Sequence, residues 1–382
     1  MTVITARRYD TGEAVKLSTT GDAVTGLERA DGSTDLWVAP GLVDLQVNGF
    51  AGQEFTDAAL TLDRVVEISL ALDRFGVTCY LPTLTTNSSE ILSHSLATIA
   101  RAIEDATDVT RRVPGIHLEG PYISREDGPR GAHPLEHCRP PDWEQFCRFQ
   151  DAARGCILVL TISSEYDVSA SFLRQVVASG VVVAIGHTNA SSDQITAAVD
   201  AGATLSTHLG NGAHPQIRRH PNYIWDQLAD DRLAASLIAD AHHLPPAVVK
   251  SFVRVKSPAR CILVSDITGM AGMPPGRYTT PGLGAVEVLP DGKLVVGGQR
   301  ELLAGASLPI TTGIGNVMRF ANVSLRDAVD MAGSHARTLL GLPQQTLDIA
   351  QPADLVVFRI DGESALQVVQ TVNQGEEVFV AR

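Results

Sequence analysis

Residues 181–187 read Val-Val-Val-Ala-Ile-Gly-His, an apolar, β-branched run that stops on a histidine. In a parallel barrel the carboxyl ends of all strands meet at one mouth, where metal-binding and catalytic side chains collect. One histidine at a strand end is more often a structural hydrogen bonder than a ligand. The same pattern recurs three times, and four such ends in step predict a metal-dependent hydrolase. The other three are Glu119 after Gly115-Ile116-His117-Leu118, His208 after residues 203–207, and Asp266 after residues 261–265.

Eight strand-like runs alternate with helix-like segments along most of the chain. Near-continuous aliphatic runs suit strands buried on both faces, as parallel sheets require. Capping residues Ser88 and Ser191 open two of the intervening helices. The pattern predicts an α/β fold, a TIM (β/α)8 barrel over residues 41–345. A doubly wound open sheet is the alternative, but no GxGxxG turn follows the first run. The runs are residues 42–48, 77–84, 113–119, 156–163, 181–187, 203–208, 236–240 and 261–266.

The two ends of the chain do not follow this alternation. Residues 1–40 hold short apolar runs between turn signals, and residues 346–382 hold ADLVVFRI and EEVFVAR. We expect these flanks to meet in one small β-sandwich-like domain beside the barrel. Pro274-Pro275-Gly276 and Asp291-Gly292 interrupt the alternation again and predict a β-hairpin inserted near residues 273–300.

The bulk composition of the 382-residue chain is typical of a soluble enzyme. A net charge of -13 argues against nucleic acid or an anionic membrane as partner. Five scattered cysteines without CxxC spacing indicate reduced thiols rather than a disulfide framework or a cysteine zinc site. We find neither a signal-peptide core nor an apolar stretch of membrane-spanning length, so we expect a cytoplasmic location.

Seven segments carry a resemblance to a known family. They are Ala39–Gly49 (APGLVDLQVNG), His117–Pro121 (HLEGP), Gly131–His133 (GAH), Ile185–Ala190 (IGHTNA), Thr207–Leu209 (THL), Val264–Asp266 (VSD) and Leu303–Gly305 (LAG). As an ordered set they resemble the N-acetylglucosamine-6-phosphate deacetylases of the amidohydrolase superfamily, whereas PGLVD alone indicates only the superfamily. The resemblance spans residues 39 to about 340. It implies a TIM barrel with a small β-domain built from both termini.

The strand-end residues predict a metal site. Glu119, His187 and His208 supply one carboxylate and two imidazoles, which suits Zn²⁺ or another divalent metal such as Fe, Mn or Co. The resemblance implies the same three ligands. Where the superfamily usually has a His-x-His pair for a second metal, this chain has Gln46 and Asn48, whose neutral amides are poor ligands. We therefore expect one metal ion per chain, with both amides lining the pocket. A buried Glu–His cluster without metal is the alternative.

Asp266 is expected to be the general base and acid, which takes a proton from the attacking water and returns it to the leaving amine. The resemblance gives this role to the matching aspartate, and a loop-capping role is the alternative. The resemblance also implies that His133 contacts the acetamido group and that Ala132 belongs to the substrate-binding residues, although His133 by itself is typical of a surface loop. His117 faces the same way as Glu119, and we interpret it as a core residue or a support for the ligands.

Recognition of the substrate beyond its acetyl group rests on the resemblance. After His208 the chain reads Gly210-Asn211-Gly212-Ala213, where the family typically has an aromatic residue, Asn, Ala and Met. The resemblance places Asn211 and Gly212 at the substrate. Arg219 falls where the family has an arginine that reaches the phosphate across a dimer interface, which implies a homodimer. A solvated basic loop is the alternative for Arg219.

Two further segments belong to the predicted substrate site. Asp240-Ala-His-His243 stands where the family has Asp-Gly-x-His, so His243 keeps the phosphate-side histidine and His242 has no assigned role. Arginine and histidine together suit a phosphate monoester. The resemblance adds Leu303, Ala304 and Gly305 to the substrate-binding residues.

These residues predict a deacetylase that converts N-acetylglucosamine 6-phosphate into glucosamine 6-phosphate and acetate. The altered segments 210–222 and 240–243 keep open a related amidohydrolase acting on another N-acyl amine or an unphosphorylated N-acetyl sugar. A non-catalytic sugar-binding protein is disfavoured, because the three ligands and Asp266 are retained.

Overall fold

The computed structural model describes residues 1–280, 284–362 and 365–381; parts of the predicted insertion and of the C-terminal region lie outside them. Eight parallel strands form one sheet in the order β14-β13-β12-β11-β10-β9-β8-β5. A bridge between Val47 and Ile267 joins its two edges, so the sheet is nearly closed as a barrel and the predicted fold class is confirmed. The strands are β5 Leu42–Val47, β8 Val77–Thr85, β9 Ile116–Glu119, β10 Ile157–Ile162, β11 Val182–Ile185, β12 Leu205–Ser206, β13 Ala234–Leu237 and β14 Cys261–Leu263.

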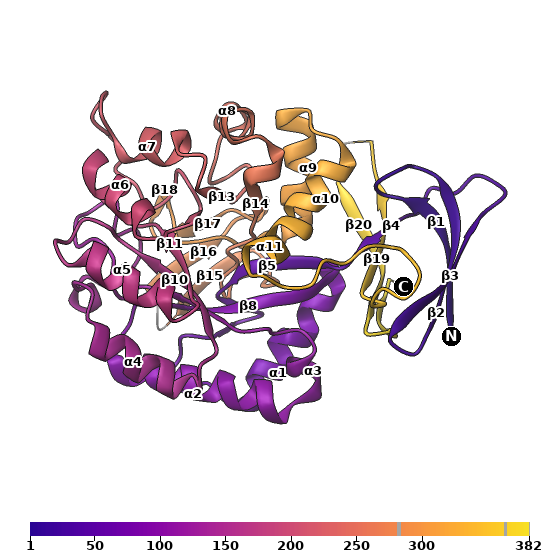
Figure 1. Ribbon diagram of the computed structural model, residues 1–382, viewed down its shortest axis with the longest axis horizontal. Helices are drawn as coiled ribbons and strands as arrows, with labels where there is room; N and C mark the ends of the chain where they lie inside the picture. The colour runs from indigo at the N-terminus through magenta and orange to yellow at the C-terminus, as the bar shows by residue number, and fades with distance from the viewer. Residues whose placement is uncertain (281–283, 363–364, 382) are drawn as a thin grey trace.

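Helices surround the barrel (Figure 1). Side-chain caps start several of them: Ser88 accepts from the backbone N–H of Ile91, and Ser191 forms a capping box with Gln194. The helices are α1 Leu62–Ala71, α2 Ser89–Asp105, α3 Thr107–Thr110, α4 Trp143–Ala152, α5 Ser169–Ala178, α6 Ser192–Asp200, α7 Tyr223–Ala229, α8 Pro246–Lys256, α9 Ile310–Ala321, α10 Leu325–Met331 and α11 Ser334–Leu339. Short 3-10 turns lie at Leu72–Phe75, Leu135–His137 and Pro258–Arg260. Among the described residues, no helix is long and apolar enough to cross a membrane.

The barrel interior changes character along its axis. A buried apolar cluster fills one part and includes Val43, Leu45, Val159 and Ile262. Farther along the same strands the buried side chains are polar, and they gather where the strands end. This division leaves an apolar floor beneath a polar mouth, which is the arrangement expected of an enzyme barrel.

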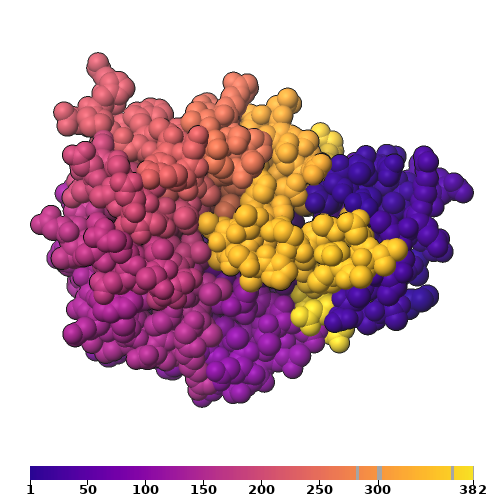
Figure 2. All heavy atoms as spheres, viewed as in Figure 1, coloured from indigo at the N-terminus to yellow at the C-terminus, as the bar shows by residue number. Residues whose placement is uncertain are grey.

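Both ends of the chain build a second sheet beside the barrel. Its seven strands lie in the order β21-β20-β19-β4-β1-β2-β3, so the last strands of the chain pair with the first. Figure 2 shows the two terminal segments packed together at one end of the molecule. The strands are β1 Thr2–Arg8, β2 Ala14–Thr20, β3 Ala23–Arg29, β4 Trp37–Pro40, β19 Leu355–Ile360, β20 Leu366–Asn373 and β21 Glu376–Val380.

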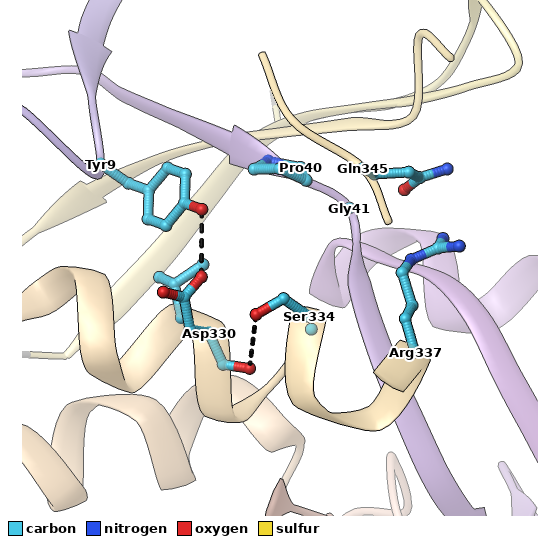
Figure 3. Close-up of a pocket in the computed structure, with 9 residues that line it drawn as sticks. Tyr9, Pro40, Gly41, Asp330, Ser334, Arg337 and Gln345 are labelled. Atoms are coloured by element: carbon cyan, nitrogen blue, oxygen red, sulfur yellow. Dashed lines mark hydrogen bonds between the residues drawn. The ribbon is translucent and has the colours of Figure 1, made fainter. Parts of the chain in front are cut away.

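The junction between this sheet and the barrel contains a small pocket (Figure 3). The Tyr9 hydroxyl donates to Oδ1 of Asp330 across it at 3.1 Å, and Ser334 and Arg337 of α11 also line it. The cavity measures about 10 Å³, which is too small for a sugar. The contact between Tyr9 and Asp330 therefore ties the sheet of the two termini to α10 of the barrel.

The segment after β14 forms a four-stranded antiparallel sheet, in the place where the sequence predicts a hairpin. Gly298 adopts a positive φ of 82°, which permits a further turn and adds strands to the two that were expected. The strands are β15 Gly276–Thr280, β16 Gly284–Val288, β17 Leu294–Val296 and β18 Gln299–Leu303. A short hairpin, β6 Gly49–Phe50 and β7 Gln53–Glu54, follows β5.

Candidate functional site

The three predicted ligands converge at the mouth of the barrel. Glu119 ends β9, His187 lies just past β11, and His208 lies just past β12. Oε1 of Glu119 is 3.1 Å from Nε2 of His187 and 3.0 Å from Nε2 of His208, and the two Nε2 atoms are 3.1 Å apart. All three side chains are buried. Three strands far apart in sequence thus bring three donor atoms to one point.

The hydrogen-bond partners of His187 show that this cluster suits a cation. Nδ1 of His187 is 2.8 Å from the carbonyl oxygen of Pro129, which can only accept, so Nδ1 carries a hydrogen. In neutral His187 the lone pair of Nε2 then faces the lone pairs of Glu119 Oε1. Two acceptors at 3.1 Å require a positive charge between them, either a proton or a metal ion. Ligands about 2.1 Å from one tetrahedral ion lie roughly 3.4 Å apart, close to the spacing found here. The cluster can therefore hold a divalent metal, and its side chains resemble those of catalytic zinc sites.

The charges of the cluster support one another. Burial would raise the pKa of Glu119, but hydrogen bonds from His187 and His208 outweigh it and hold the pKa well below its ordinary value. Burial would lower the pKa of His208, but the Glu119 carboxylate outweighs it and raises the pKa. Glu119 is thus ionised and ready to act as an anionic ligand.

Backbone strain marks the same positions. His187, His208 and Asp266 all have positive φ angles, of 49°, 29° and 54°. Residues other than glycine rarely adopt positive φ angles. Those that do cluster at active sites and ligand-binding positions, where the surrounding structure holds the strained backbone in place. Gly212 lies against the imidazole of His187, since an added Cβ there would meet Nδ1 at 2.6 Å. Glycine at this position thus lets the loop approach the His187 imidazole.

His133 lies beside the cluster and offers a donor. Its ring centroid is 4.4 Å from that of His187, and ligand atoms of Glu119, His133 and His187 lie within 4.8 Å of one another. Nδ1 of His133 accepts from the backbone N–H of Thr86 at 3.4 Å, and burial lowers its pKa to about 3. The neutral ring therefore carries its hydrogen on Nε2. It suits donation to a carbonyl oxygen better than metal binding, so His208 is the better third ligand.

Asp266 lies at the same mouth, partly exposed, on the loop that follows β14. Its Oδ1 accepts from Nδ2 of Asn48 at 2.7 Å, and its backbone N–H donates to the carbonyl oxygen of Gln46 at 2.9 Å. Burial, reinforced by the charge of Glu119, raises its pKa to about 6. A carboxyl group that titrates near neutrality can exchange protons at physiological pH.

Beneath the cluster, His117 belongs to a hydrogen-bonded chain whose direction is determined. Its Nδ1 is 3.1 Å from the carbonyl oxygen of Leu45 and must donate, so Nε2 accepts from Oγ1 of Thr161 at 2.7 Å. Thr161 in turn accepts from Oγ1 of Thr207 at 2.7 Å. Burial lowers the pKa of His117 to about 4, which keeps it neutral. His117 therefore supports the neighbours of Glu119 and His208 and is not itself at the cluster.

The predicted phosphate residues are less closely gathered. His243 is held by Asp240, whose Oδ2 lies 2.7 Å from His243 Nδ1. Asn211 donates to the carbonyl oxygen of His208 at 3.2 Å. Arg219 is exposed, and the structure does not bring its side chain to the cluster. His242 donates through Nε2 to the carbonyl oxygen of Asp291, which ties its loop to the inserted sheet.

The remaining predicted residues lie around the mouth. Leu303 ends β18, Ala304 and Gly305 follow it, and the next residue, Ala306, bridges to Ile267 beside Asp266. Ala132 is exposed, one residue before His133.

A second cluster, which the sequence did not indicate, joins the loops that follow the three ligand-bearing strands. Oε2 of Glu126 accepts from Nδ2 of Asn189 at 2.9 Å and lies 3.4 Å from Nε2 of His214. The Tyr223 hydroxyl lies 2.9 Å from both the backbone nitrogen and Nδ1 of His214. Each loop supplies one polar side chain, and no motif spacing links them. Pro129 was also missed, because it acts through a backbone carbonyl.

Comparison with known proteins points in one direction, although no family model matches the chain. N-acetylglucosamine-6-phosphate deacetylase from Bacillus subtilis is 30% identical over 358 residues, which cover 91% of this chain and 86% of that protein. The human protein of the same name is 33% identical over 360 residues, covering 90% and 84%.

Solved structures agree. N-acetyl-D-glucosamine-6-phosphate deacetylase from Mycobacterium smegmatis matches with a TM-score of 0.87 and 30% identity, over 99% of this chain and 100% of that one. A mutant of that protein in complex with N-acetyl-D-glucosamine-6-phosphate also has a TM-score of 0.87, at 28% identity over the full length of both chains. An enamidase of the amidohydrolase superfamily, at 13% identity and a TM-score of 0.61, shares the fold.

Proposed function

We propose that this chain hydrolyses N-acetylglucosamine 6-phosphate to glucosamine 6-phosphate and acetate, because it belongs to the N-acetylglucosamine-6-phosphate deacetylase family. It is a hydrolase of the amidohydrolase superfamily. The observation that carries the proposal is the convergence of Glu119, His187 and His208 at the mouth of a barrel, where Asp266 lies within the influence of the Glu119 and His208 charges. The sugar phosphate bound by the similar Mycobacterium smegmatis protein supports the choice of substrate.

The cofactor we propose is a single divalent ion, zinc by the composition of its ligands. Glu119 through Oε1, and His187 and His208 through Nε2, would hold it. Such an ion supplies Lewis-acid activation of a water molecule and of the acetyl carbonyl group. Gln46 and Asn48 already donate to Glu119 and Asp266, which argues against a role as ligands of a second ion.

The chain's own residues manage the protons. Ionised Asp266 takes a proton from the water that attacks the acetyl carbon. It then delivers this proton to the amine nitrogen as the C–N bond breaks, since an unprotonated amine is a very poor leaving group. His133, with its hydrogen on Nε2, donates to the carbonyl oxygen and stabilises the negative charge that develops there.

The rest of the sugar is proposed to lie along Asn211, Gly212 and the segment 303–305, with its phosphate toward His243. Arg219 is exposed on its own chain, which agrees with service to the phosphate of a partner subunit in a homodimer. A doubly charged phosphate ester does not cross a membrane unaided, so we place the reaction in the cytoplasm.

Steady-state kinetics with N-acetylglucosamine 6-phosphate and N-acetylglucosamine, together with elemental analysis, test this function. We expect a strong preference for the phosphorylated sugar and about one equivalent of metal per chain. Equal turnover of both sugars would favour an amidohydrolase for unphosphorylated N-acetyl sugars or other N-acyl amines. The loop Gly210-Asn211-Gly212-Ala213, which departs from the family pattern, is the observation that favours this second candidate.

A further inference from the structure

The end of β5 places two amide side chains against two carboxylates. Nε2 of Gln46 donates to Oε2 of Glu119 at 3.1 Å. Nδ2 of Asn48 donates to Oδ1 of Asp266 at 2.7 Å and to the Asp266 carbonyl oxygen at 3.3 Å. Both amides are buried, with 1% and 6% of their surface exposed, whereas the Asp266 acceptor is partly exposed.

The orientation of the Asn48 amide follows from its partners. An ionised carboxylate oxygen and a backbone carbonyl oxygen can only accept hydrogen bonds, so the NH₂ group of Asn48 must face both. A flipped amide would set its oxygen against two other oxygens. The backbones are tied as well, because Asp266 donates to the Gln46 carbonyl at 2.9 Å and Asn48 donates to the Ile267 carbonyl at 2.8 Å. Asn48 and Asp266 are therefore held in one register.

We propose that Asn48 is a positioning residue that gives the two carboxylate oxygens of Asp266 different roles. Oδ1 stays hydrogen-bonded to the Asn48 amide, and Oδ2 alone carries the proton. A proton on Oδ1 would face the Asn48 N–H, whereas no donor among the described residues bonds to Oδ2. This inference rests on the proposed deacetylation. The water loses a proton to Oδ2 as its oxygen bonds to the acetyl carbon. The same proton moves to nitrogen as the C–N bond breaks, and Asp266 is ionised again.

Gln46 makes the corresponding hydrogen bond to Glu119, so the effects of changing the two amides can be compared. Its N–H occupies Oε2 of Glu119 and leaves Oε1 facing His187 and His208. A change at Gln46 should therefore disturb metal binding, whereas a change at Asn48 should disturb proton transfer and leave the metal in place. Substitutions of Gln46 and Asn48 should thus impair two different steps, metal binding and proton transfer.

The test compares the holoenzymes of Asn48→Leu, Asn48→Asp and Gln46→Leu with the wild type. Leucine has the shape of asparagine without its donor, and it also removes the buried Oδ1 of Asn48, which has no hydrogen-bond partner among the described residues. We expect kcat of Asn48→Leu to fall on the order of ten- to a hundred-fold, with KM and metal content unchanged. The acid limb of its kcat/KM profile should move up by about one pH unit, because a hydrogen bond to the ionised form is lost.

Asn48→Asp should move this limb further, because it places a second carboxylate against Oδ1. The other ionisable groups around Asp266 are Glu119, His208 and His243, together with Asp44 and Glu54, and neither substitution alters them. Gln46→Leu should lose metal in chelator competition while its metal-saturated acid limb stays in place.

Two results would overturn the role of Asn48. One is an Asn48→Leu enzyme with wild-type kcat, and the other is a fall in kcat without movement of the acid limb, which marks a purely structural role. Failure of the proposed function would look different, because the wild type itself would then not deacetylate the sugar phosphate. Thermal unfolding of each variant confirms that it is folded.

Discussion

The two ends of the proposed substrate site are built differently. At the metal end, each ligand is buried, and second partners hold Oε2 of Glu119 and Nδ1 of His187 in place. At the phosphate end, His243 is anchored by Asp240, but Arg219 lies exposed on the loop that follows β12. The proposed metal end is complete within a single chain, whereas the proposed phosphate end includes an arginine that its own chain leaves exposed.

This difference follows from what each end has to do. Bond cleavage needs charged groups that are preorganised and shielded from water, because electrostatic interactions are strong there. Phosphate binding needs only a cation within reach, and a flexible exposed arginine can supply it to a neighbour. Damage at the metal end should therefore lower kcat, whereas damage at the phosphate end should raise KM.

The largest effect is expected at the metal end, from Asp266→Asn. Asparagine keeps the shape but cannot shuttle a proton, and each lost transfer costs about 10²–10⁴-fold, so kcat should fall by several orders of magnitude. Metal content and unfolding temperature should remain those of the wild type. A variant that keeps about a tenth of the wild-type kcat would remove Asp266 from the mechanism and point to His133.

At the phosphate end, Arg219→Ala should cost roughly ten- to more than a hundred-fold in kcat/KM for N-acetylglucosamine 6-phosphate, because a charge-assisted contact is lost. The loss should fall on KM, and the slow turnover of the unphosphorylated sugar should not change. Arg218→Ala is the matched control, since it removes another exposed charge from the same loop.

Mixed subunits then test where Arg219 acts. If it serves a partner, Asp266→Asn chains mixed with Arg219→Ala chains should form heterodimers with restored activity. One site of each heterodimer then combines an intact Asp266 with an intact Arg219. Mixtures no more active than their components would place Arg219 in its own subunit's site or outside the reaction.

The same contrast describes what the sequence could reveal. The eight barrel strands were predictable because they are continuous aliphatic runs buried on both faces. The inserted sheet was predicted with too few strands, because short strands such as Leu294–Val296 carry little periodicity. At the site, residue type alone suggested a carboxylate and two imidazoles at strand ends, and the structure does bring these side chains together.

What the sequence could not reveal depends on backbone positions and long-range contacts. The Pro129 carbonyl, which selects the tautomer of His187, has no signal in residue type. The meeting of Glu126, Asn189 and His214 depends on how three loops fold over the barrel mouth. The donor roles of Gln46 and Asn48 likewise appear only when their carboxylate partners are in place.

A smaller effect concerns pH at the metal end. Asp266 must be ionised to act as a base, and its pKa is raised to about 6 by burial and by the charge of Glu119. Activity should therefore fall as the pH drops through this pKa, by about tenfold per unit. A bound divalent cation favours the ionised form, so the midpoint of the acid limb should be no higher than pH 6. A pH profile of kcat/KM with a midpoint above 7 would contradict this assignment.

The smallest effect tests how far the rigidity of the metal end extends beneath the ligands. Thr161→Val keeps the volume of the side chain but removes the hydroxyl that joins His117 to Thr207. Direct partners of metal ligands typically contribute 10- to 100-fold in affinity, and Thr161 is one step farther away, so we expect a loss of about tenfold or less. Competition with a chelator measures this affinity without relying on turnover.

Thr161→Ser retains the hydroxyl and should bind metal like the wild type, even though it loses a methyl group. If serine and valine weaken metal binding equally, packing rather than the hydrogen-bonded chain supports the site. If neither has an effect, the preorganisation of the metal end stops at the ligands and their immediate partners.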